Sequence, residues 1–348
     1  MKKKISILDC TLRDGGLALE DSFLNKDKCL FFNKKITKNF IDTIKKAKID
    51  IIEIGSIEIS KKSKTNFSIY QNIEEVSKLI PTNKVSNQMY VALYRGPDSP
   101  YNKIPEWNPS LCEGVRVIIR YSELKKSMDF CHMLSDKGFK VFVQPMVTSR
   151  YANDELKFLI RCSNKLKAYA LYIVDSYGYM TSKDLLKLFK KFDEGLNKEI
   201  SIGFHAHNNL NLAFSNVQEF INQKTNRSLI IDSTIMGMGQ GAGNMQTELL
   251  ISYLNKKKNF NYGFNFILDA CEIIEKYSKN SLWGYSVKNL LPAINKTAYK
   301  FSSALRKKYQ LSYSEINRIL SKMPKTIKHR YSKENLLKLV RLLKNNKI

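Results

Sequence analysis

Two of the chain's four histidines, His205 and His207, stand one residue apart in the sequence GFHAHNN at residues 203–209. In a β-strand, successive side chains point to opposite faces, so the two imidazoles would share one face and Phe204 and Ala206 the other. Two parallel imidazoles are well placed to hold one divalent cation. A pair of hydrogen-bonded core histidines is the alternative. The metal interpretation therefore requires that this segment be a strand with further ligands close to it.

The segments around the histidine pair alternate between buried strands and amphipathic helices. Eight apolar runs have the pattern of buried strands: KISILDC (4–10), IDIIEIG (49–55), QMYVALY (88–94), GVRVIIR (114–120), KVFVQPM (140–146), AYALYIVD (168–175), EISIGFHAH (199–207) and SLIIDSTIM (228–236). Helical periodicity separates the runs, as in SELKKSMDFCHMLSDKG and SKDLLKLFKKFDEGL. Eight alternating units over about 250 residues predict an α/β fold, a TIM (β/α)₈ barrel.

A doubly wound open sheet is the competing fold. It usually has a glycine-rich turn after its first strand, where this chain has TLRDGG. The sequence GMGQGAGN at 237–244 follows the eighth run instead and is weak as a dinucleotide fingerprint. Beyond about residue 260 the pattern is helical only. We therefore expect a barrel catalytic domain at residues 1–260 and an all-helical C-terminal extension at residues 261–348.

Closure of the barrel predicts the remaining ligands. The eighth strand would pair with the first, so the carboxyl ends of strands seven, eight and one would form one arc, where barrel active sites lie. Asp14 follows the first strand and Asn244 follows the eighth. With His205 and His207 they offer two nitrogens and two oxygens. This mixed set suits Mn²⁺, Zn²⁺, Co²⁺ or Mg²⁺.

Three motifs carry a resemblance to a known family. LDCTLRDGG (8–16), GFHAHNNLNLA (203–213) and GMGQGAGN (237–244) followed by QTE together resemble the DRE-TIM metallolyases. That superfamily includes pyruvate aldolases, hydroxymethylglutaryl-CoA lyase, isopropylmalate synthase and homocitrate synthase. WGYS at 283–286 and the helical tail resemble the 4-hydroxy-2-oxovalerate aldolase branch in particular.

The resemblance implies roles for the motif residues. Asp14, His205 and His207 would hold one divalent metal ion, Mn²⁺ by preference, and Asn244 would be a ligand or near-ligand. Arg13 would steady an enolate oxygen formed from pyruvate or another 2-oxo acid. A metal that chelates such a substrate acts as a Lewis acid, and a guanidinium adds fixed positive charge where the enolate forms.

Other candidate residues are less constrained by the sequence. Alternation turns Glu53 into the barrel, where it would assist catalysis or simply form an ion pair with Arg13. Asp175, in VDSYGYM, would bind substrate, orient the metal shell or close its own loop. Gln144 ends the fifth strand, where inward polar residues commonly meet substrate. Two glycines of GMGQGAG, Gly239 and Gly241, would let the chain fold closely over the substrate.

The resemblance is incomplete at the proton-transfer step. In the 4-hydroxy-2-oxovalerate aldolases a histidine that serves as acid or base follows the R-D-G motif, and Leu17 stands there in this chain. In that branch a tyrosine of the appended region helps to form the active site. Tyr285 is the candidate, with a packing role as its alternative. Tyr177 or a metal-bound water could also supply the base.

Charge and cysteine content bear on the partners. The net charge of +26 is typical of proteins that meet nucleic acid, anionic lipid or acidic metabolites, although lysine is spread along the whole chain. Residues 301–348 hold 13 Lys and Arg against 2 Glu, as expected for a solvated helical face, a docking surface or an anionic-ligand site. Six dispersed cysteines without a C-x-x-C pair indicate reduced thiols. No apolar run approaches a membrane span, so we expect a cytoplasmic protein.

Three classes of function remain open from the sequence. A metal-dependent aldolase or lyase would act on a 2-oxo acid and an aldehyde. A Claisen-type transferase would use acyl-CoA in place of the aldehyde. A non-catalytic basic protein on the same barrel would bind nucleic acid or a protein partner, which the metal-ligand set argues against. The aldolase resemblance also implies a homo-oligomer and a dehydrogenase partner.

Overall fold

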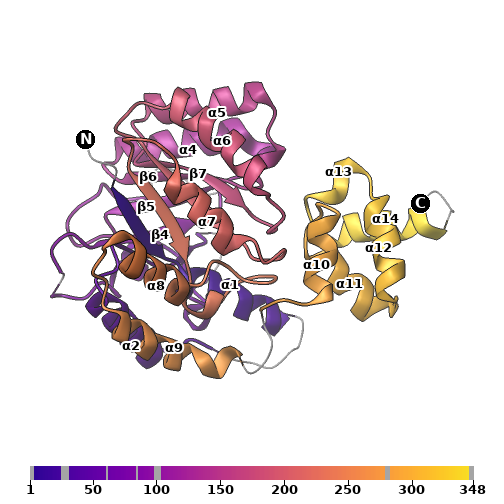
Figure 1. Ribbon diagram of the computed structural model, residues 1–348, viewed down its shortest axis with the longest axis horizontal. Helices are drawn as coiled ribbons and strands as arrows, with labels where there is room; N and C mark the ends of the chain where they lie inside the picture. The colour runs from indigo at the N-terminus through magenta and orange to yellow at the C-terminus, as the bar shows by residue number, and fades with distance from the viewer. Residues whose placement is uncertain are drawn as a thin grey trace.

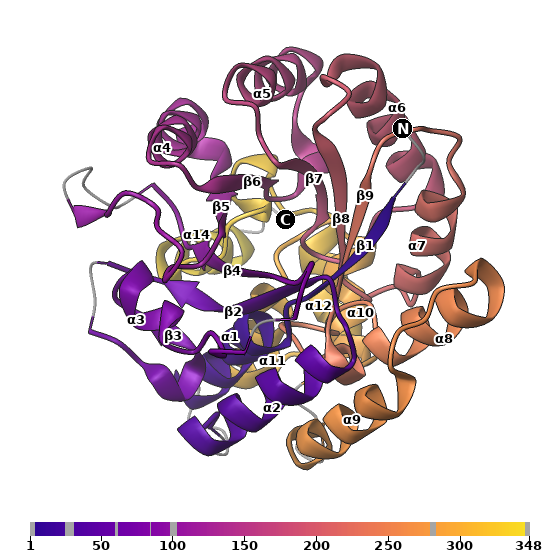
Figure 2. The ribbon, with the colours of Figure 1, turned by 90° about the vertical axis from the view of Figure 1, so that its left-hand side faces the viewer.

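The computed structural model describes residues 4–24, 31–59, 62–83, 85–97, 103–278 and 283–344. Eight parallel strands form a closed barrel in the order β1-β9-β8-β7-β6-β5-β4-β2, with β2 also paired to β1. Their bounds are β1 (Ile5–Asp9), β2 (Ile51–Ile57), β4 (Met89–Tyr94), β5 (Gly114–Ile119), β6 (Lys140–Pro145), β7 (Ala170–Asp175), β8 (Ser201–Ala206) and β9 (Leu229–Ser233). Figure 2 shows the ring of strands with helices around it. The predicted TIM barrel is confirmed. Seven of its strands fall within the apolar runs, and β2 extends two residues beyond its run, which ends at Gly55.

Helices cover the outside of the strands. They are α2 (Lys34–Lys46), α3 (Ile73–Ser77), α4 (Leu124–Asp136), α5 (Asn153–Lys165), α6 (Ser182–Gly195), α7 (Ala213–Asn222), α8 (Thr247–Lys258) and α9 (Phe264–Ser278). Helix α1 (Thr11–Leu24) is almost wholly buried and lies inside this ring of helices (Figure 2). Side-chain caps fix several of their starts; Thr181, for example, accepts from the backbone N–H of Asp184 at the start of α6. One large apolar cluster fills the space between these helices and the strands.

Short elements join the strands and helices. They are the 3₁₀ turns η1 (Thr65–Phe67), η3 (Tyr121–Glu123), η4 (Thr148–Arg150) and η5 (Ile235–Gly237), and the two-residue strand β3 (Ile69–Tyr70). Strand β3 extends the sheet beyond β2 and lies outside the barrel ring. The sequence did not predict β3, because two residues are too few to show an alternating pattern.

Five further helices follow the barrel. They are α10 (Val287–Ile294), α11 (Lys300–Tyr309), α12 (Tyr313–Ser321), α13 (Lys325–Lys328) and α14 (Lys333–Lys344), and they share an apolar cluster of their own. They form a distinct group at one end of the barrel (Figure 1). Helix α9 differs from them, because it packs on α2, α8 and η5 of the barrel. The domain boundary at residues 260 and 261 stays a prediction.

The C-terminal helices cover the carboxyl ends of the barrel strands. Tyr177, after β7, donates its hydroxyl to the carbonyl of His329 at 2.7 Å. Asn209, after β8, donates to the carbonyl of Asn289 at 3.0 Å. The catalytic face of a barrel lies at this end, so the helices are placed to limit access to it. In the part of the chain that the structure describes, no helix is both long and apolar enough to cross a membrane.

Candidate metal centre

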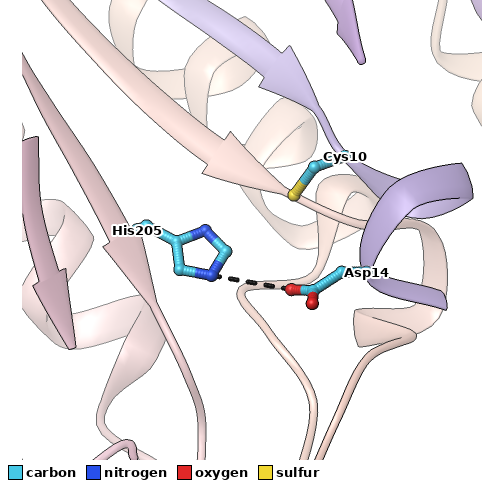
Figure 3. A group of neighbouring side chains, drawn as sticks. All are labelled: Cys10, Asp14 and His205. Carbon is cyan, nitrogen blue, oxygen red and sulfur yellow. Dashed lines mark ion pairs between the residues drawn. The ribbon is translucent and has the colours of Figure 1, made fainter. Parts of the chain in front are cut away.

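Asp14, His205 and His207 converge at the carboxyl end of the barrel. Asp14 lies in the first turn of α1, His205 near the end of β8 and His207 just beyond it. Oδ2 of Asp14 is 3.5 Å from Nε2 of His205 and 4.0 Å from Nε2 of His207, and the two Nε2 atoms are 3.3 Å apart. Figure 3 shows the approach of His205 to Asp14. Three electron-pair donors therefore surround one point.

The far sides of both imidazoles are held by hydrogen bonds. Nδ1 of His205 lies 2.9 Å from Oδ2 of Asp232 on β9. Burial opposes ionisation of Asp232, but Arg116 and His205 outweigh it and keep its pKa below the usual range. The ionised carboxylate accepts, so Nδ1 of His205 carries a proton, and Nε2 is the ring nitrogen that faces Asp14 and His207. The ring of His207 is hydrogen-bonded to the backbone of Gln240.

The loop after β9 brings Asn244 into the same arc. An isolated bridge joins Asn244 to His207, and Met245 N donates to the Ala206 carbonyl, so the loop lies along the end of β8. Nδ2 of Asn244 donates to Oδ2 of Asp14 at 2.7 Å. The loop must pass closely here: a Cβ on Gly239 would lie 2.3 Å from this Nδ2. Glycine at 239 is therefore a steric requirement of the Asn244 position.

Arg13 links the ligand cluster to a buried ion network. Its Nη1 is 2.8 Å from Oδ1 of Asp14, and its Nε is 2.9 Å from Oε2 of Glu53. The ion pair with Glu53, one of the alternatives from sequence, is thus present. Nη1 of Arg116 lies 2.6 Å from the same Glu53 oxygen, and its Nη2 pairs with Asp232. Arg116 is fully buried. Because it contacts both carboxylates, it links Glu53, the partner of Arg13, to Asp232, the partner of His205.

The buried charges set the protonation states of the cluster. Burial alone would raise the pKa of Asp14, but Arg13 and the two imidazoles lower it to about 2. Burial lowers the pKa of His207 to about 4, although Asp14 opposes that shift. At neutral pH the site therefore presents a carboxylate and a neutral His207, the forms that bind cations.

The donor set fits a divalent metal ion. Two imidazole nitrogens and a carboxylate oxygen face one point, and two lone pairs on facing nitrogens repel unless a cation or proton lies between them. Oδ1 of Asn244 is buried and accepts no hydrogen bond from any described residue. It is a further oxygen that a ligand could use. Imidazole with carboxylate and amide oxygen suits Mn²⁺, Zn²⁺ or Co²⁺.

Comparison with known proteins agrees with this geometry. Residues 115–276 match the HMGL-like family model. The chain carries an HMGL-like domain. The resemblance to the DRE-TIM metallolyases, a lyase and aldolase family whose aldolases use a divalent metal, is confirmed.

Three known proteins illustrate what the chain is similar to. The 4-hydroxy-2-oxovalerate aldolase of Geobacillus genomosp. 3 is 27% identical over 276 residues, 78% of this chain and 77% of that protein. The oxaloacetate decarboxylase of Mycobacterium tuberculosis is 23% identical, over 72% of this chain and 70% of that protein. The N-terminal domain of a Bacteroides vulgatus protein classed provisionally as an aldolase has a TM-score of 0.72 and 26% identity, covering 90% of this chain and 99% of that one.

Cys10 is a member of the cluster that sequence reasoning did not single out. Its sulfur, a carboxylate oxygen of Asp14 and a nitrogen of His205 lie within 4.8 Å of one another (Figure 3). The thiol donates to the Ser233 carbonyl at 3.4 Å, and burial raises its pKa well above the ordinary value. Cys10 is therefore a protonated thiol beside the candidate ligands. The five cysteines within the described ranges are all free thiols.

Three predicted substrate contacts occupy different settings in the HMGL-like domain. Gln144 is buried at the end of β6. Its amide nitrogen, Nε2, has no hydrogen-bond partner among the described residues, so it is free to donate to a ligand. Both Asp175 oxygens accept from the backbone of its own loop, at Tyr179 N and Met180 N. This contact corresponds to the loop-closing alternative for Asp175. Gly241 has a φ of 67°, which permits the turn beside the site.

The tyrosine that reaches the HMGL-like site from the C-terminal helices is Tyr299. Its hydroxyl donates to Oδ2 of Asp21 at 2.7 Å, and its ring lies 3.6 Å from where a Gly241 Cβ would stand. Tyr285, the tyrosine proposed from sequence, is 60% exposed. A role for Tyr285 at the site stays a prediction. Within the WGYS motif, Trp283 donates to the Met236 carbonyl at 2.7 Å, so the motif itself contacts the loop after β9.

Proposed function

We propose that the protein is a divalent-metal-dependent carbon–carbon lyase or aldolase that acts on pyruvate or a related 2-oxo acid through an enolate. The convergence of Asp14, His205 and His207 around one point carries this proposal. Asn244 would complete the ligand set. A bound divalent ion would supply Lewis acidity toward the carboxylate and keto oxygens of the substrate.

Arg13 is the residue of this chain best placed to stabilise the enolate. Glu53 and Asp14 take up two of its guanidinium nitrogens and hold its plane fixed. The remaining N–H groups can donate to a developing enolate oxygen. Because the group is almost buried, its charge acts with little screening by solvent, which favours the enolate over the keto form.

The proton-transfer group has to come from outside the R-D-G motif. Leu17 is a buried hydrocarbon side chain on α1 and cannot move a proton. Tyr177 already donates its hydroxyl to the His329 carbonyl. Tyr299 likewise donates its hydroxyl to Asp21, and burial and Asp21 raise its pKa well above its ordinary value. It would serve as a neutral proton donor only after exchanging Asp21 for the substrate.

Two of the similar proteins support a 2-oxo acid substrate. They are named for 4-hydroxy-2-oxovalerate and for oxaloacetate, both of which are 2-oxo acids. Breaking the C3–C4 bond of either compound leaves the enolate of pyruvate. We propose this shared enolate, and not a particular aldehyde, as the common element. The aldolase resemblance further suggests a homo-oligomer and a dehydrogenase partner, for which sedimentation and pull-down measurements are the tests.

Deuterium exchange at C3 of pyruvate tests the proposal before any second substrate is known. The protein is incubated with pyruvate in D₂O with and without Mn²⁺, the metal is removed with EDTA, and exchange is read by NMR. We expect metal-dependent exchange that His205→Ala abolishes. His132→Ala, on the outer helix α4, should exchange like the wild type.

Two outcomes would change the assignment. Absence of exchange with every divalent ion, for pyruvate and for larger 2-oxo acids, would contradict the enolate mechanism. Release of free CoA thiol from acetyl-CoA in the presence of a 2-oxo acid would identify a Claisen-type acyl transferase instead.

A further inference from the structure

A cavity lies between the barrel and the C-terminal helices. Its volume is about 430 Å³. One wall comes from the segments after β6 and β7, which contribute Arg150 and Tyr179, and the other from the α10–α11 turn and α13, which contribute Lys296, Lys325 and Lys328. The metal ligands follow β8, β9 and β1, so this cavity is a separate feature of the same barrel face.

The walls of the cavity are strongly cationic. Arg150, Lys296, Lys325 and Lys328 bring four positive charges to it, and Asp184 brings one negative charge. The Asp184 carboxylate already accepts from the backbone and the hydroxyl of Thr181 in the cap of α6. Burial, with Lys296 and Lys325 nearby, lowers the pKa of Lys328, as expected for crowded ammonium groups that lack a counter-ion.

Aromatic rings hold two of the cations in place. The Arg150 guanidinium carbon lies 3.8 Å from the centre of the Tyr121 ring, and Nζ of Lys296 lies 5.8 Å from the centre of the Tyr179 ring. The backbone of Lys296 has a φ of 53°, which is uncommon for a residue with a side chain. Cations fixed by stacking lose less entropy when they bind an anion than free surface lysines do.

Neutral donors complete the lining. Ser149 Oγ and Tyr179 Oη lie 3.1 Å apart at the wall. Nδ1 of His329 is buried and has no hydrogen-bond partner in the described structure. Burial together with Arg150 and Lys328 lowers the pKa of His329 to about 4, so at neutral pH the ring is uncharged and can still donate one hydrogen bond. This unpartnered ring nitrogen, with Arg150 and Lys328 nearby, is a further group that an anion in the cavity could use.

We propose that this cavity binds the phosphate or diphosphate group of a small phosphorylated metabolite. Phosphate oxygens match the planar donor fork of Arg150 and the point charges of Lys296, Lys325 and Lys328. The site is concave and bounded on both sides, which suits a small molecule, whereas a nucleic-acid backbone would need an open groove. This inference does not depend on the proposed aldolase activity.

Calorimetric titration of the metal-free full-length protein with pyrophosphate and with inorganic phosphate, at constant ionic strength, tests the proposal. We expect saturable binding, and at least about tenfold weaker binding in Lys325→Gln/Lys328→Gln, the loss typical of removed charge-assisted hydrogen bonds. Lys308→Gln/Lys322→Gln removes two charges from the same helical extension outside the cavity and should bind like the wild type. Thermal unfolding of both variants shows whether each is folded.

Three results would overturn the proposal. Equal weakening in the two double variants would assign binding to general surface charge. Absence of binding at millimolar pyrophosphate would show that the cavity is not a phosphate site. An oligonucleotide that binds more tightly than pyrophosphate and is weakened by Lys325→Gln/Lys328→Gln would assign the charge of the cavity to nucleic acid. Because His205→Ala should leave phosphate binding intact, loss of the enolate activity and loss of this site are separable.

Discussion

Nδ1 of His205 lies 2.9 Å from Oδ2 of Asp232, and the same carboxylate pairs with the buried Arg116. The carboxylate fixes which nitrogen of His205 is protonated and leaves the other for a metal. An interaction of this kind raises ligand basicity and orients the ring.

Asp232→Asn should weaken Mn²⁺ binding by about 10- to 100-fold, because the neutral amide no longer fixes the His205 tautomer. Calorimetric titration with Mn²⁺ measures the change. Asp193→Asn, which removes the ion pair with Arg227 away from the site, is the matched control and should leave the affinity unchanged. Equal affinities in wild type and Asp232→Asn would show that the carboxylate does not support the ligand.

Arg116→Met should lower the free energy of unfolding by about 3–5 kcal/mol, because Glu53 and Asp232 would remain buried without their shared counter-ion. Urea unfolding with EDTA present measures this without a contribution from metal binding. Arg318→Met, on the exposed face of α12, should change the free energy by no more than about 0.5 kcal/mol. A loss as small in Arg116→Met as in Arg318→Met would mean that the network contributes little.

Gly239→Ala should displace the Asn244 amide from Asp14, because the new Cβ would lie 2.3 Å from Nδ2 of Asn244. We expect Mn²⁺ affinity and pyruvate exchange to fall on the order of tenfold or more, as misplaced site groups commonly cause. Gly195→Ala, where the nearest atoms belong to the Ile160 side chain, is the control. Unchanged exchange in Gly239→Ala would argue against a functional role for Asn244.

Titration of the buried Asp9 should make the free energy of unfolding depend on pH, and Asp9→Asn should remove this dependence. Burial raises the pKa of Asp9 to about 7, against hydrogen bonds from Thr11 that lower it. Between the unfolded value near 3.8 and about 7, the folded state retains a proton that the unfolded state has lost. The stabilisation is therefore fully present below the unfolded pKa and is lost as pH rises through the folded pKa.

The difference between the two unfolding free energies isolates this effect, since all other titrating groups are common to both proteins. From pH 5 to pH 8, wild type should lose roughly 3 kcal/mol relative to Asp9→Asn. Urea unfolding at several pH values gives the curve. A flat difference would show that Asp9 titrates normally in the folded protein.

The sequence predicted the barrel and the placement of its main polar groups, because both follow from periodicity. Alternation turned His205, His207 and Glu53 toward the barrel interior, and closure placed Asp14 and Asn244 on the same arc as the histidines. The structure brings these residues together. The common cause is local: a strand one residue out of register would have turned its inward side chains, such as His205 and Glu53, to the opposite face.

The remaining site residues depend on contacts between distant segments. Arg116 and Asp232 each interrupt an apolar run, GVRVIIR and SLIIDSTIM, and a charge inside a buried strand was the signal that could have identified them. Their pairing joins strands far apart in sequence, which periodicity does not reveal. The approach of Tyr299 to the loop after β9 could not be predicted from sequence, since it rests on how the start of α11 packs against that segment.

The Asp21 carboxylate binds Tyr299 and Lys300 from the C-terminal helices and also Gln240 from the loop that carries Asn244. One acidic side chain thereby joins the C-terminal helices to the loop that carries Asn244. Every proposed metal ligand lies before residue 245 in the sequence, and the C-terminal helices α10–α14 begin at residue 287. Changes in the C-terminal helices would therefore alter access to the carboxyl end of the barrel while leaving the proposed ligands unchanged.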